Sequence, residues 1–203
     1  YATQCKKYFA DKTPTIEGVE IDEKITALSK KYFNASDDVK VTTYDGRAYL
    51  NAVKNTYDVI MVDAYQDITI PFQMSSKEFF TLVKGHLKPD GVMVVNMNMR
   101  GGGEGNINQY LSDTISTVFP EVFTIDVSNS SNRILFASDN AKMTQVFDNN
   151  LARVTDTSLY SAMYGVKTNY EKYSPTGKYI LTDDKAPVEL LGMKVVDRMI
   201  SDE

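Results

Sequence analysis

Residues 15–22 read Thr-Ile-Glu-Gly-Val-Glu-Ile-Asp, and this stretch says most about the fold. It predicts a buried strand that ends at Glu20 and leads directly into a helix over about residues 23–33. Asp22 is a residue type that caps helices. The apolar residues Ile25, Leu28 and Tyr32 recur at i, i+3 and i+7, which predicts that they form the apolar face of this helix.

The acidic end of this strand points to a ligand. In nucleoside-binding α/β folds, a carboxylate at the end of the second strand accepts hydrogen bonds from the ribose hydroxyls. Glu20 takes that position here. The matching glycine-rich turn lies about 20 residues upstream in such folds, and Tyr1 comes too late to include it. The sequence therefore predicts a nucleoside-binding domain that lacks its first strand and its glycine-rich loop.

Composition narrows the class of protein. A chain of 203 residues, 42% of them hydrophobic, can bury one good core. A net charge of -5 argues against nucleic acid as a partner and suits a cationic ligand better. The single cysteine, Cys5, favours a reducing, cytoplasmic location. No apolar run of about 18 residues is present, so we expect no membrane segment in this chain. The sequence leaves open whether a longer parent protein carries a membrane anchor upstream of Tyr1.

Strands and helices alternate along most of the chain. The continuous apolar run 57–62 predicts a central parallel strand that is covered on both faces. Ser75 and Glu78 form a capping box for a helix that starts at Lys77. Residues 121–127 and 133–138 are typical of two closing, antiparallel strands. This alternation predicts an α/β fold with a mostly parallel sheet and helices on both faces.

The alternation stops near residue 140. We therefore predict a domain over residues 1–140 and a helical, partly irregular extension over 141–203 that packs on the same domain. The extension is rich in tyrosine, which favours packing or an oligomer surface, and a homodimer is the assembly considered.

Three acids follow three successive predicted strands: Glu20, Asp45 and Asp63. Ligands of open parallel sheets bind beyond the carboxyl ends of the strands. Glu20 suits ribose hydroxyls, Asp45 suits the exocyclic amine of an adenine, and Asp63 lies where the reacting end of a nucleoside ligand would be. A helix cap or a solvated loop acid explains each one equally well if it is taken singly. With one histidine and one cysteine, no transition-metal site is expected.

Several blocks of the sequence together resemble the polyamine aminopropyltransferases, the spermidine synthase family, over roughly residues 1–140. The blocks are V-E-I-D-E-K-I at 19–25, T-T-Y-D-G-R-A-Y-L at 42–50, Y-D-V-I-M-V-D-A-Y at 57–65 and F-F-T-L-V-K-G-H-L-K-P-D-G-V at 79–92. The resemblance implies a Rossmann-like, class I methyltransferase-type fold. It also implies transfer of an aminopropyl group from decarboxylated S-adenosylmethionine, a co-substrate rather than a tightly bound cofactor, to a polyamine such as putrescine.

The resemblance assigns roles to individual residues. Glu20 and Asp22 would bind the nucleoside at its ribose, and Asp45 with Gly46 would contact the adenine. Asp63 would be the catalytic acid. Asp67 would be a second carboxylate for a diamine.

The sequence also departs from the family pattern. The family motif Asp-Ser-Ser-Asp-Pro reads Asp-Ala-Tyr-Gln-Asp at residues 63–67, and the segment 127–137 replaces the family's Pro-Thr-Tyr-Pro-Ser-Gly. The blocks at 70–74 and 181–189 look more like a divergent bacterial spermidine-synthase-like branch, some of whose members carry membrane segments. These departures leave the amine substrate open.

Two other hypotheses remain. The first is an S-adenosylmethionine-dependent methyltransferase on the same scaffold, acting on an amine. The second is a non-catalytic, N-terminally truncated domain. Because the first strand and its glycine turn are missing, we expect this chain alone to bind nucleoside weakly and to turn over slowly or not at all.

Overall fold

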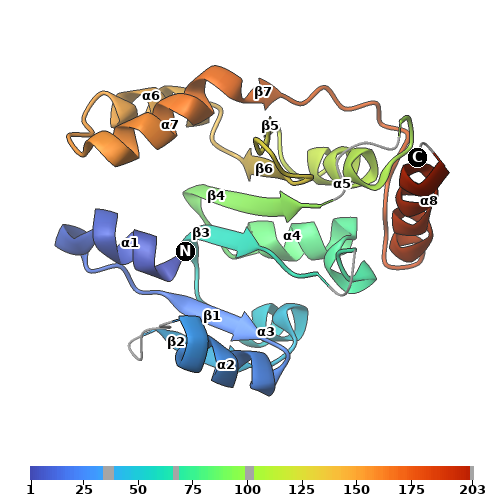
Figure 1. Cartoon of the computed structure of the whole chain (residues 1–203), viewed down its shortest axis with the longest axis horizontal. Coiled ribbons are helices and arrows are strands. Elements are labelled where there is room, and N and C mark those ends of the chain that lie inside the picture. The colour runs from blue at the N-terminus through green and yellow to red at the C-terminus, as the bar shows by residue number, and fades with distance from the viewer. Residues whose placement is uncertain (34–38, 66–68, 99–102, 202–203) are drawn as a thin grey trace. The chain divides into compact units, whose positions relative to one another are not determined.

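The computed structural model describes residues 1–33, 39–65, 69–98 and 103–201. Its contacts group the chain into two compact units, Tyr1–Lys54 and Asn55–Glu203 (Figure 1). The division predicted at residue 140 stays a prediction. None of the helices in the described ranges is both long and apolar enough to cross a membrane.

The first unit is built on a parallel pair of strands. Its elements in chain order are α1 (Ala2–Tyr8), a 3₁₀ turn (Ala10–Lys12), β1 (Glu17–Glu20), α2 (Glu23–Phe33), β2 (Lys40–Thr43) and α3 (Gly46–Ala52). Glu17 pairs with Lys40 and Glu20 pairs with Thr43. The predicted strand ending at Glu20 and the helix that follows it are both confirmed. The strand is half-buried rather than buried, and the predicted apolar face of the helix, formed by Ile25, Leu28 and Tyr32, is exposed.

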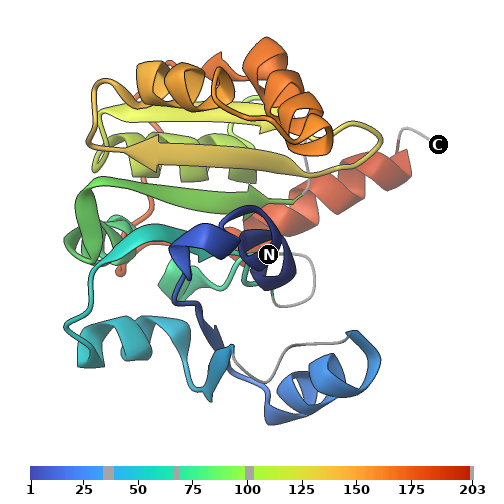
Figure 2. The same ribbon diagram turned by 90° about the vertical axis from the view of Figure 1, so that its left-hand side faces the viewer.

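The second unit contains a five-stranded sheet in the order β3-β4-β6-β5-β7 (Figure 2). Its strands are β3 (Tyr57–Val62), β4 (Leu87–Met97), β5 (Glu121–Asp126), β6 (Arg133–Ser138) and β7 (Glu171–Lys172). β3 and β4 are parallel, whereas β6, β5 and β7 continue the sheet in antiparallel pairing. Together with the parallel pair of the first unit, this arrangement confirms the predicted α/β class and the two antiparallel closing strands. The prediction of a mostly parallel sheet is wrong for the described residues, because antiparallel pairing joins most strands of the five-stranded sheet.

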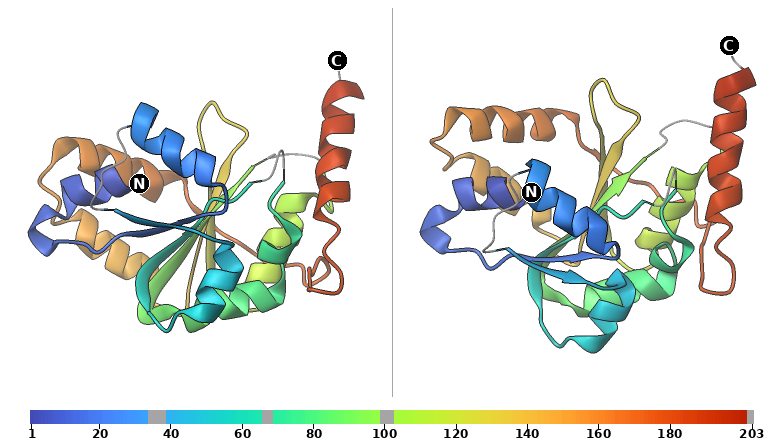
Figure 3. Two further views of the ribbon diagram at one scale, coloured as in Figure 1. Left: turned by 90° about the horizontal axis from the view of Figure 1, so that it is seen from below. Right: turned by 60° about the horizontal axis from the view of Figure 1, so that its bottom comes forward.

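Helices flank both faces of this sheet. They are α4 (Lys77–Gly85), α5 (Ile107–Ser116), α6 (Met143–Leu151), α7 (Thr157–Asn169) and α8 (Val188–Ser201), with a 3₁₀ turn at Phe72–Met74. α4 and α5 cover one face, α8 packs against α5, and α6 and α7 lie on the other face (Figure 3). The predicted capping box at α4 is wrong in detail. Ser76, not Ser75, is the N-cap and accepts the Phe79 N–H at 3.2 Å.

The hydrophobic core of the second unit lies between the sheet and α4 and α5. Its fully buried side chains include Phe79, Phe80, Val83, Met93, Val95, Leu111, Ile115 and Leu135. The opposite face is covered less completely. Val59 is 53% exposed and Met61 is 38% exposed, so the prediction that both faces of β3 are covered is wrong. β3 is an edge strand of this sheet.

Pro89, Asp90 and Gly91 lie inside β4. The parallel register jumps there, because Tyr57 pairs with Leu87 and Val59 pairs with Val92. A Cβ atom on Gly91 would lie 2.9 Å from the Lys88 carbonyl oxygen. Glycine is therefore required at this irregularity by the close approach of the backbone.

A C-terminal strap, residues 173–183, supplies partners to a buried carboxylate on α5. Asp113 is 1% exposed. Its Oδ1 accepts the Tyr173 hydroxyl at 2.8 Å and the Thr176 N–H at 2.9 Å. Its Oδ2 accepts the Thr176 hydroxyl at 2.5 Å and the Tyr179 N–H at 3.2 Å. Burial alone would raise the pKa of Asp113, but these hydrogen bonds outweigh it and lower the pKa below its usual value.

The same strap binds the ends of α4 and α5. Leu181 donates its N–H to the Thr114 hydroxyl at 2.9 Å and accepts the Lys77 N–H at 2.9 Å. The Ser76 hydroxyl donates to Asp183 Oδ1 at 2.5 Å. The strap therefore completes the hydrogen bonding of two core helices.

Candidate active site

Asp63 lies directly beyond the carboxyl end of β3, and its side chain is exposed. Val62 pairs with Val95 in the parallel ladder between β3 and β4. The residues that follow them, Asp63 and Asn96, are therefore neighbours. The Asn96 side-chain amide donates a hydrogen bond of 2.8 Å to Asp63 Oδ1. The predicted position of Asp63 at a strand end is confirmed, and its carboxylate is oriented by the adjacent strand.

Tyr65 is a second polar group at this edge. Its hydroxyl donates to the Asn96 carbonyl oxygen and accepts the Asn98 backbone N–H at 2.5 Å. Burial raises the pKa of this phenol, the Asn98 N–H lowers it, and the charge of Asp63 raises it further, with a net increase. Tyr65 therefore stays protonated at neutral pH and joins the two strand ends as a neutral donor and acceptor.

The turn between β5 and β6 binds the same edge. Asn132 donates its amide hydrogen to Asn96 Oδ1 at 3.0 Å. The Ser131 hydroxyl donates to Asn98 Oδ1 at 3.0 Å. We call the connected set the strand-end network, which consists of Asp63, Tyr65, Asn96, Asn98, Ser131 and Asn132.

Sequence reasoning found one member of this network and missed the others. One signal was available for Asn96, because it ends an apolar strand in the same way as Asp63 does. The remaining members sit in loops without periodicity. They become recognisable only when the strands are paired.

Replacement of Tyr65 by phenylalanine tests how much the network depends on this hydroxyl. Both hydrogen bonds to β4 would be lost, so we expect the free energy of unfolding to fall by about 1–2 kcal/mol. Urea unfolding measures the effect. Tyr160→Phe, on the exposed side of α7, is the matched control, and equal behaviour of the two variants would contradict the role given to Tyr65.

Two further candidate acids meet at one edge of the first unit. β1 and β2 are parallel, so their carboxyl ends lie side by side. The Tyr44 N–H donates to the Glu20 carbonyl oxygen at 3.0 Å. Asp45 and Gly46 follow directly on that strand end. Glu20 and the Asp45–Gly46 pair are therefore brought together, as the sequence predicted.

These acids also have local structural roles. Glu20 Oε1 accepts the Asp22 N–H at 2.9 Å, and Asp22 Oδ1 accepts the Lys24 N–H at 2.7 Å. This confirms Asp22 as a cap of α2. Asp45 is the N-cap of α3, because its Oδ1 accepts the Ala48 N–H at 2.7 Å. A carboxylate has two oxygens, so a capping bond and a ligand bond can share one residue.

Two parts of the predicted site stay predictions. Glu20 and Asp45 belong to one unit and Asp63 belongs to the other, so the convergence of the three acids on one site stays a prediction. Asp67 lies outside the described residues. Within the described ranges, no group of three or more His, Cys, Asp or Glu side chains could hold a metal ion.

Comparison with known proteins identifies relatives of this chain. Residues 6–150 match the family model of the spermine/spermidine synthase domain. A protein from Bifidobacterium longum, named as a probable polyamine aminopropyl transferase, is 50% identical over 219 aligned residues. The alignment covers 100% of this chain and 49% of that protein. The chain therefore spans about half the length of this curated relative.

Solved structures show the same fold. A probable spermidine synthase from Corynebacterium glutamicum aligns with a TM-score of 0.62 at 21% identity, covering 90% of this chain and 69% of that chain. Human methyltransferase-like protein 13 aligns with a TM-score of 0.57 at 23% identity, covering 79% of this chain and 74% of that chain. These similarities confirm the predicted class I methyltransferase-type, Rossmann-like fold.

Proposed function

From the premise that this chain belongs to the spermine/spermidine synthase family, we propose that it serves aminopropyl transfer from decarboxylated S-adenosylmethionine to a polyamine such as putrescine. The observation that carries the proposal is the family match over residues 6–150, which includes all the candidate acids. The carboxylate of Asp63 accepts a hydrogen bond from Asn96 at the end of β3. An oriented carboxylate is the kind of group that aminopropyl transfer to an amine requires.

The donor would be held by the first unit. Glu20, supported by Asp22, would accept hydrogen bonds from the two ribose hydroxyls. Asp45 with Gly46 would contact the adenine. What supports this assignment is the meeting of Glu20 and Asp45 at one edge of the parallel pair, where ligands of such sheets bind.

The chemical step is a displacement at a methylene carbon beside a sulfonium. The amine nitrogen donates its lone pair to that carbon, the carbon–sulfur bond breaks, and its electron pair neutralises the sulfur. Methylthioadenosine leaves, and the product keeps its new nitrogen as a secondary ammonium, so the one proton released is the one that the amine loses before it attacks. A free alkylamine has a pKa near that of lysine, about 10.4, so it arrives mostly protonated.

Asp63 would hold the ammonium and assist the loss of the proton that frees the lone pair. Asp67 would bind the far ammonium of a diamine. Most of the rate enhancement would come from alignment of nitrogen, carbon and sulfur. The oriented carboxylate of the strand-end network suits this task.

The proposal also covers the partners, the cellular location and the oligomeric state of the protein. The net charge of -5 suits a cationic amine and gives no support to nucleic acid as a partner. The single, free Cys5 supports a cytoplasmic location. A homodimer is part of the proposal, to be checked by sedimentation.

A donor comparison tests the proposal. Purified protein is titrated with S-adenosylmethionine and with its decarboxylated form, and release of methylthioadenosine is followed with and without putrescine. Tighter binding of the decarboxylated form and putrescine-dependent release are expected. Release of S-adenosylhomocysteine from the carboxylated donor would instead identify an amine methyltransferase. Binding of neither donor would favour a non-catalytic domain.

Glu20→Ala tests the donor site. Two hydrogen bonds to a charged acceptor would be lost, so we expect affinity for methylthioadenosine to fall about 10- to 100-fold. Calorimetric titration gives the ratio to the unchanged protein. Glu23→Ala, an exposed acid in the first turn of α2, is the control and is expected to leave the affinity unchanged. Equal affinities for Glu20→Ala and the unchanged protein would remove Glu20 from the site.

A further inference from the structure

The side-chain amides of Asn132 and Asn96 form a chain of hydrogen bonds that ends at Asp63. Asn132 donates an Nδ2 hydrogen to Asn96 Oδ1 at 3.0 Å. Asn96 in turn donates an Nδ2 hydrogen to Asp63 Oδ1 at 2.8 Å. We call these three residues the amide chain. Both hydrogen bonds run in the same direction, from the turn between β5 and β6 to the carboxylate beyond β3.

The direction of the amide chain fixes the orientation of Asn96. A carboxamide has one donor end and one acceptor end, and its partners decide which end faces which way. Because Asn132 donates to the oxygen of Asn96, the NH2 group of Asn96 faces Asp63. If this carboxamide turned by 180°, its oxygen would face a carboxylate and its NH2 group would face another NH2 group. Two acceptors and two donors would then oppose each other, so the observed orientation is favoured.

The turn that carries Asn132 is itself held by hydrogen bonds. The Asn132 carbonyl oxygen accepts the Val127 N–H at 3.0 Å, and the Asn132 N–H donates to the Ser130 hydroxyl oxygen at 3.1 Å. The next residue, Arg133, donates its Nε hydrogen to Asp126 Oδ1 at 2.6 Å across the paired ends of β5 and β6. The backbone of Asn132 is therefore fixed on both sides, which lowers the entropy that its side chain loses on bonding.

The orientation of Asn96 matters for the reaction proposed above. A carboxylate has two oxygens, so Asp63 can accept the Asn96 amide on one and face the amine with the other. A turned Asn96 would instead present its amide oxygen to the amine. An amide oxygen accepts a hydrogen bond from an ammonium, but it is not among the groups that act as general bases. Such an oxygen would bind the protonated amine and slow the loss of its proton.

We propose that Asn132 is a positioning residue for Asp63 that acts through the carboxamide of Asn96, a role that rests on the proposed function of Asp63 as the catalytic acid. Asn132 does not contact the reacting atoms. It keeps the donor end of Asn96 directed at Asp63 and the acceptor end directed away from the amine.

The orientation of Asn96 can be measured without substrate. In protein labelled with ¹⁵N and ¹³C, we expect a nuclear Overhauser contact between the Asn96 NH2 protons and the Asp63 methylene protons. Asn132→Asp replaces the donor by a charged acceptor. The NH2 group is then attracted to two carboxylates, so its contact to Asp63 should weaken about twofold and a contact to the methylene of residue 132 should appear.

Kinetics separate positioning from a general structural role. In the complex with putrescine, the ammonium neutralises Asp63, so the carboxylate at position 132 attracts the Asn96 NH2 group more strongly. We expect Asn132→Asp to lower kcat about tenfold while KM for putrescine stays constant or falls, because a turned Asn96 still binds the ammonium. Asn132→Leu removes the donor without adding charge and should lower kcat about threefold, again without a rise in KM.

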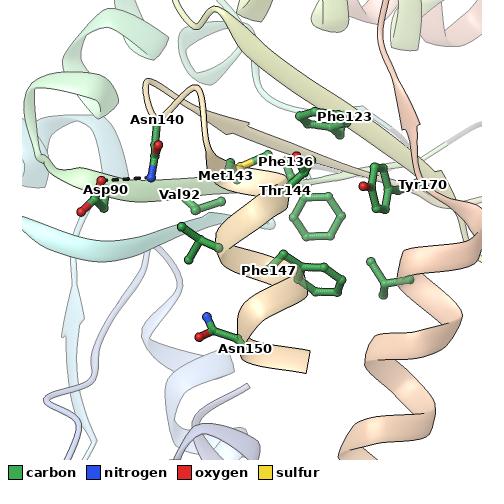
Figure 4. Close-up of a pocket in the computed structure, with 12 residues that line it drawn as sticks. Asp90, Val92, Phe123, Phe136, Asn140, Met143, Thr144, Phe147, Asn150 and Tyr170 are labelled. Carbon is green, nitrogen blue, oxygen red and sulfur yellow. Dashed lines mark hydrogen bonds between the residues drawn. The ribbon is translucent and has the colours of Figure 1, made fainter. Parts of the chain in front are cut away.

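Asn140→Asp is the matched control. Asn140 donates an Nδ2 hydrogen to Asp90 Oδ1 at 3.0 Å, at one end of the apolar cavity between the sheet and helices α6 and α7 (Figure 4). The contact has the same chemistry as the amide chain. However, Asp90 and Asn96 lie toward opposite ends of β4, and six residues of extended strand span about 20 Å. Asn140→Asp should therefore leave kcat, KM and the Asn96 contact unchanged.

Two results would overturn the role of Asn132. The first is an Asn96 contact to Asp63 that is unchanged in Asn132→Asp, and the second is a rise in KM for putrescine in either variant. The unfolding midpoint checks folding, and Asn132→Leu decides by kinetics if Asn132→Asp does not fold. Absence of aminopropyl transfer in the unchanged protein would reject the proposed function alone, because the Asn96 contact is measured without substrate.

Discussion

Replacement of Asp63 by asparagine is expected to lower kcat for aminopropyl transfer by about 100- to 10,000-fold, the usual contribution of a positioned general base. Asparagine keeps the shape of the side chain and can still bond to Asn96. It cannot attract an ammonium or accept its proton. Affinity for methylthioadenosine should stay within about twofold, because the nucleoside is assigned to other residues. Initial rates with putrescine and calorimetric titration measure the two quantities.

A surface acid of the same strand provides the control. Asp58 lies in β3 and pairs with Lys88 at 2.8 Å in an exposed ion pair. Such pairs contribute at most about 1 kcal/mol to stability, and Asp58 has no place in the proposed chemistry. Asp58→Asn should therefore keep full activity. A rate for Asp63→Asn equal to that of the Asp58 variant would show that Asp63 is not the catalytic acid.

Asp113→Asn is expected to cause the largest loss of stability, about 3 kcal/mol in the free energy of unfolding. The carboxylate accepts two hydrogen bonds on each oxygen, and all the donors come from the C-terminal strap. An asparagine would place its own amide hydrogens against the backbone N–H of Thr176 or of Tyr179. Urea unfolding, followed by circular dichroism, gives the difference.

This loss should depend on pH in a defined direction. The folded-state pKa of Asp113 is lowered, whereas in the unfolded chain an aspartate titrates near its ordinary value of about 3.9. The stabilising contribution is therefore fully present above about pH 4 and disappears as the pH falls through the folded-state pKa. The difference between parent and variant should accordingly be constant from pH 7 to about pH 5 and should shrink below pH 4.

A capping aspartate is the matched control for Asp113. Asp156 accepts the Leu159 N–H at 2.8 Å as the N-cap of α7. Asparagine caps helices as well as aspartate does, so Asp156→Asn should change stability little. If the Asp113 variant were as stable as the Asp156 variant, the strap would not be held by its carboxylate.

The acids at the strand ends could be predicted because their signal is local. An apolar run followed at once by a carboxylate identifies Glu20 and Asp63 without knowledge of the fold. Their partners could not be found in this way. Asn96 is 33 positions from Asp63 in sequence, and only the pairing of β3 with β4 places it there. The register of that pairing is a property of the whole sheet.

The sequence predicts burial only for the apolar face of each helix or strand. The sequence of α5 is amphipathic, and Asp113 lies on its polar side. In the structure that side is covered by the C-terminal strap, whose irregular sequence carries no periodic signal. The same limit explains β3, whose apolar run predicted two covered faces although Val59 is exposed. The hydrophobicity of a side chain indicates whether its burial is favourable. Whether the side chain is buried depends on the neighbouring elements that pack against it.

The strap also sets the order in which the protein can mature during synthesis. Ser76 and Asp183 are 107 positions apart, and Asp113 and Thr176 are 63 positions apart. On the ribosome, α4 and α5 are therefore made long before the segment that completes their hydrogen bonds. The nascent second unit must wait, with a charged carboxylate still hydrated, until residues 173–183 emerge. Ribosome-bound chains that stop before residue 173 should accordingly be sensitive to protease, and chains extended well past residue 183 should become resistant.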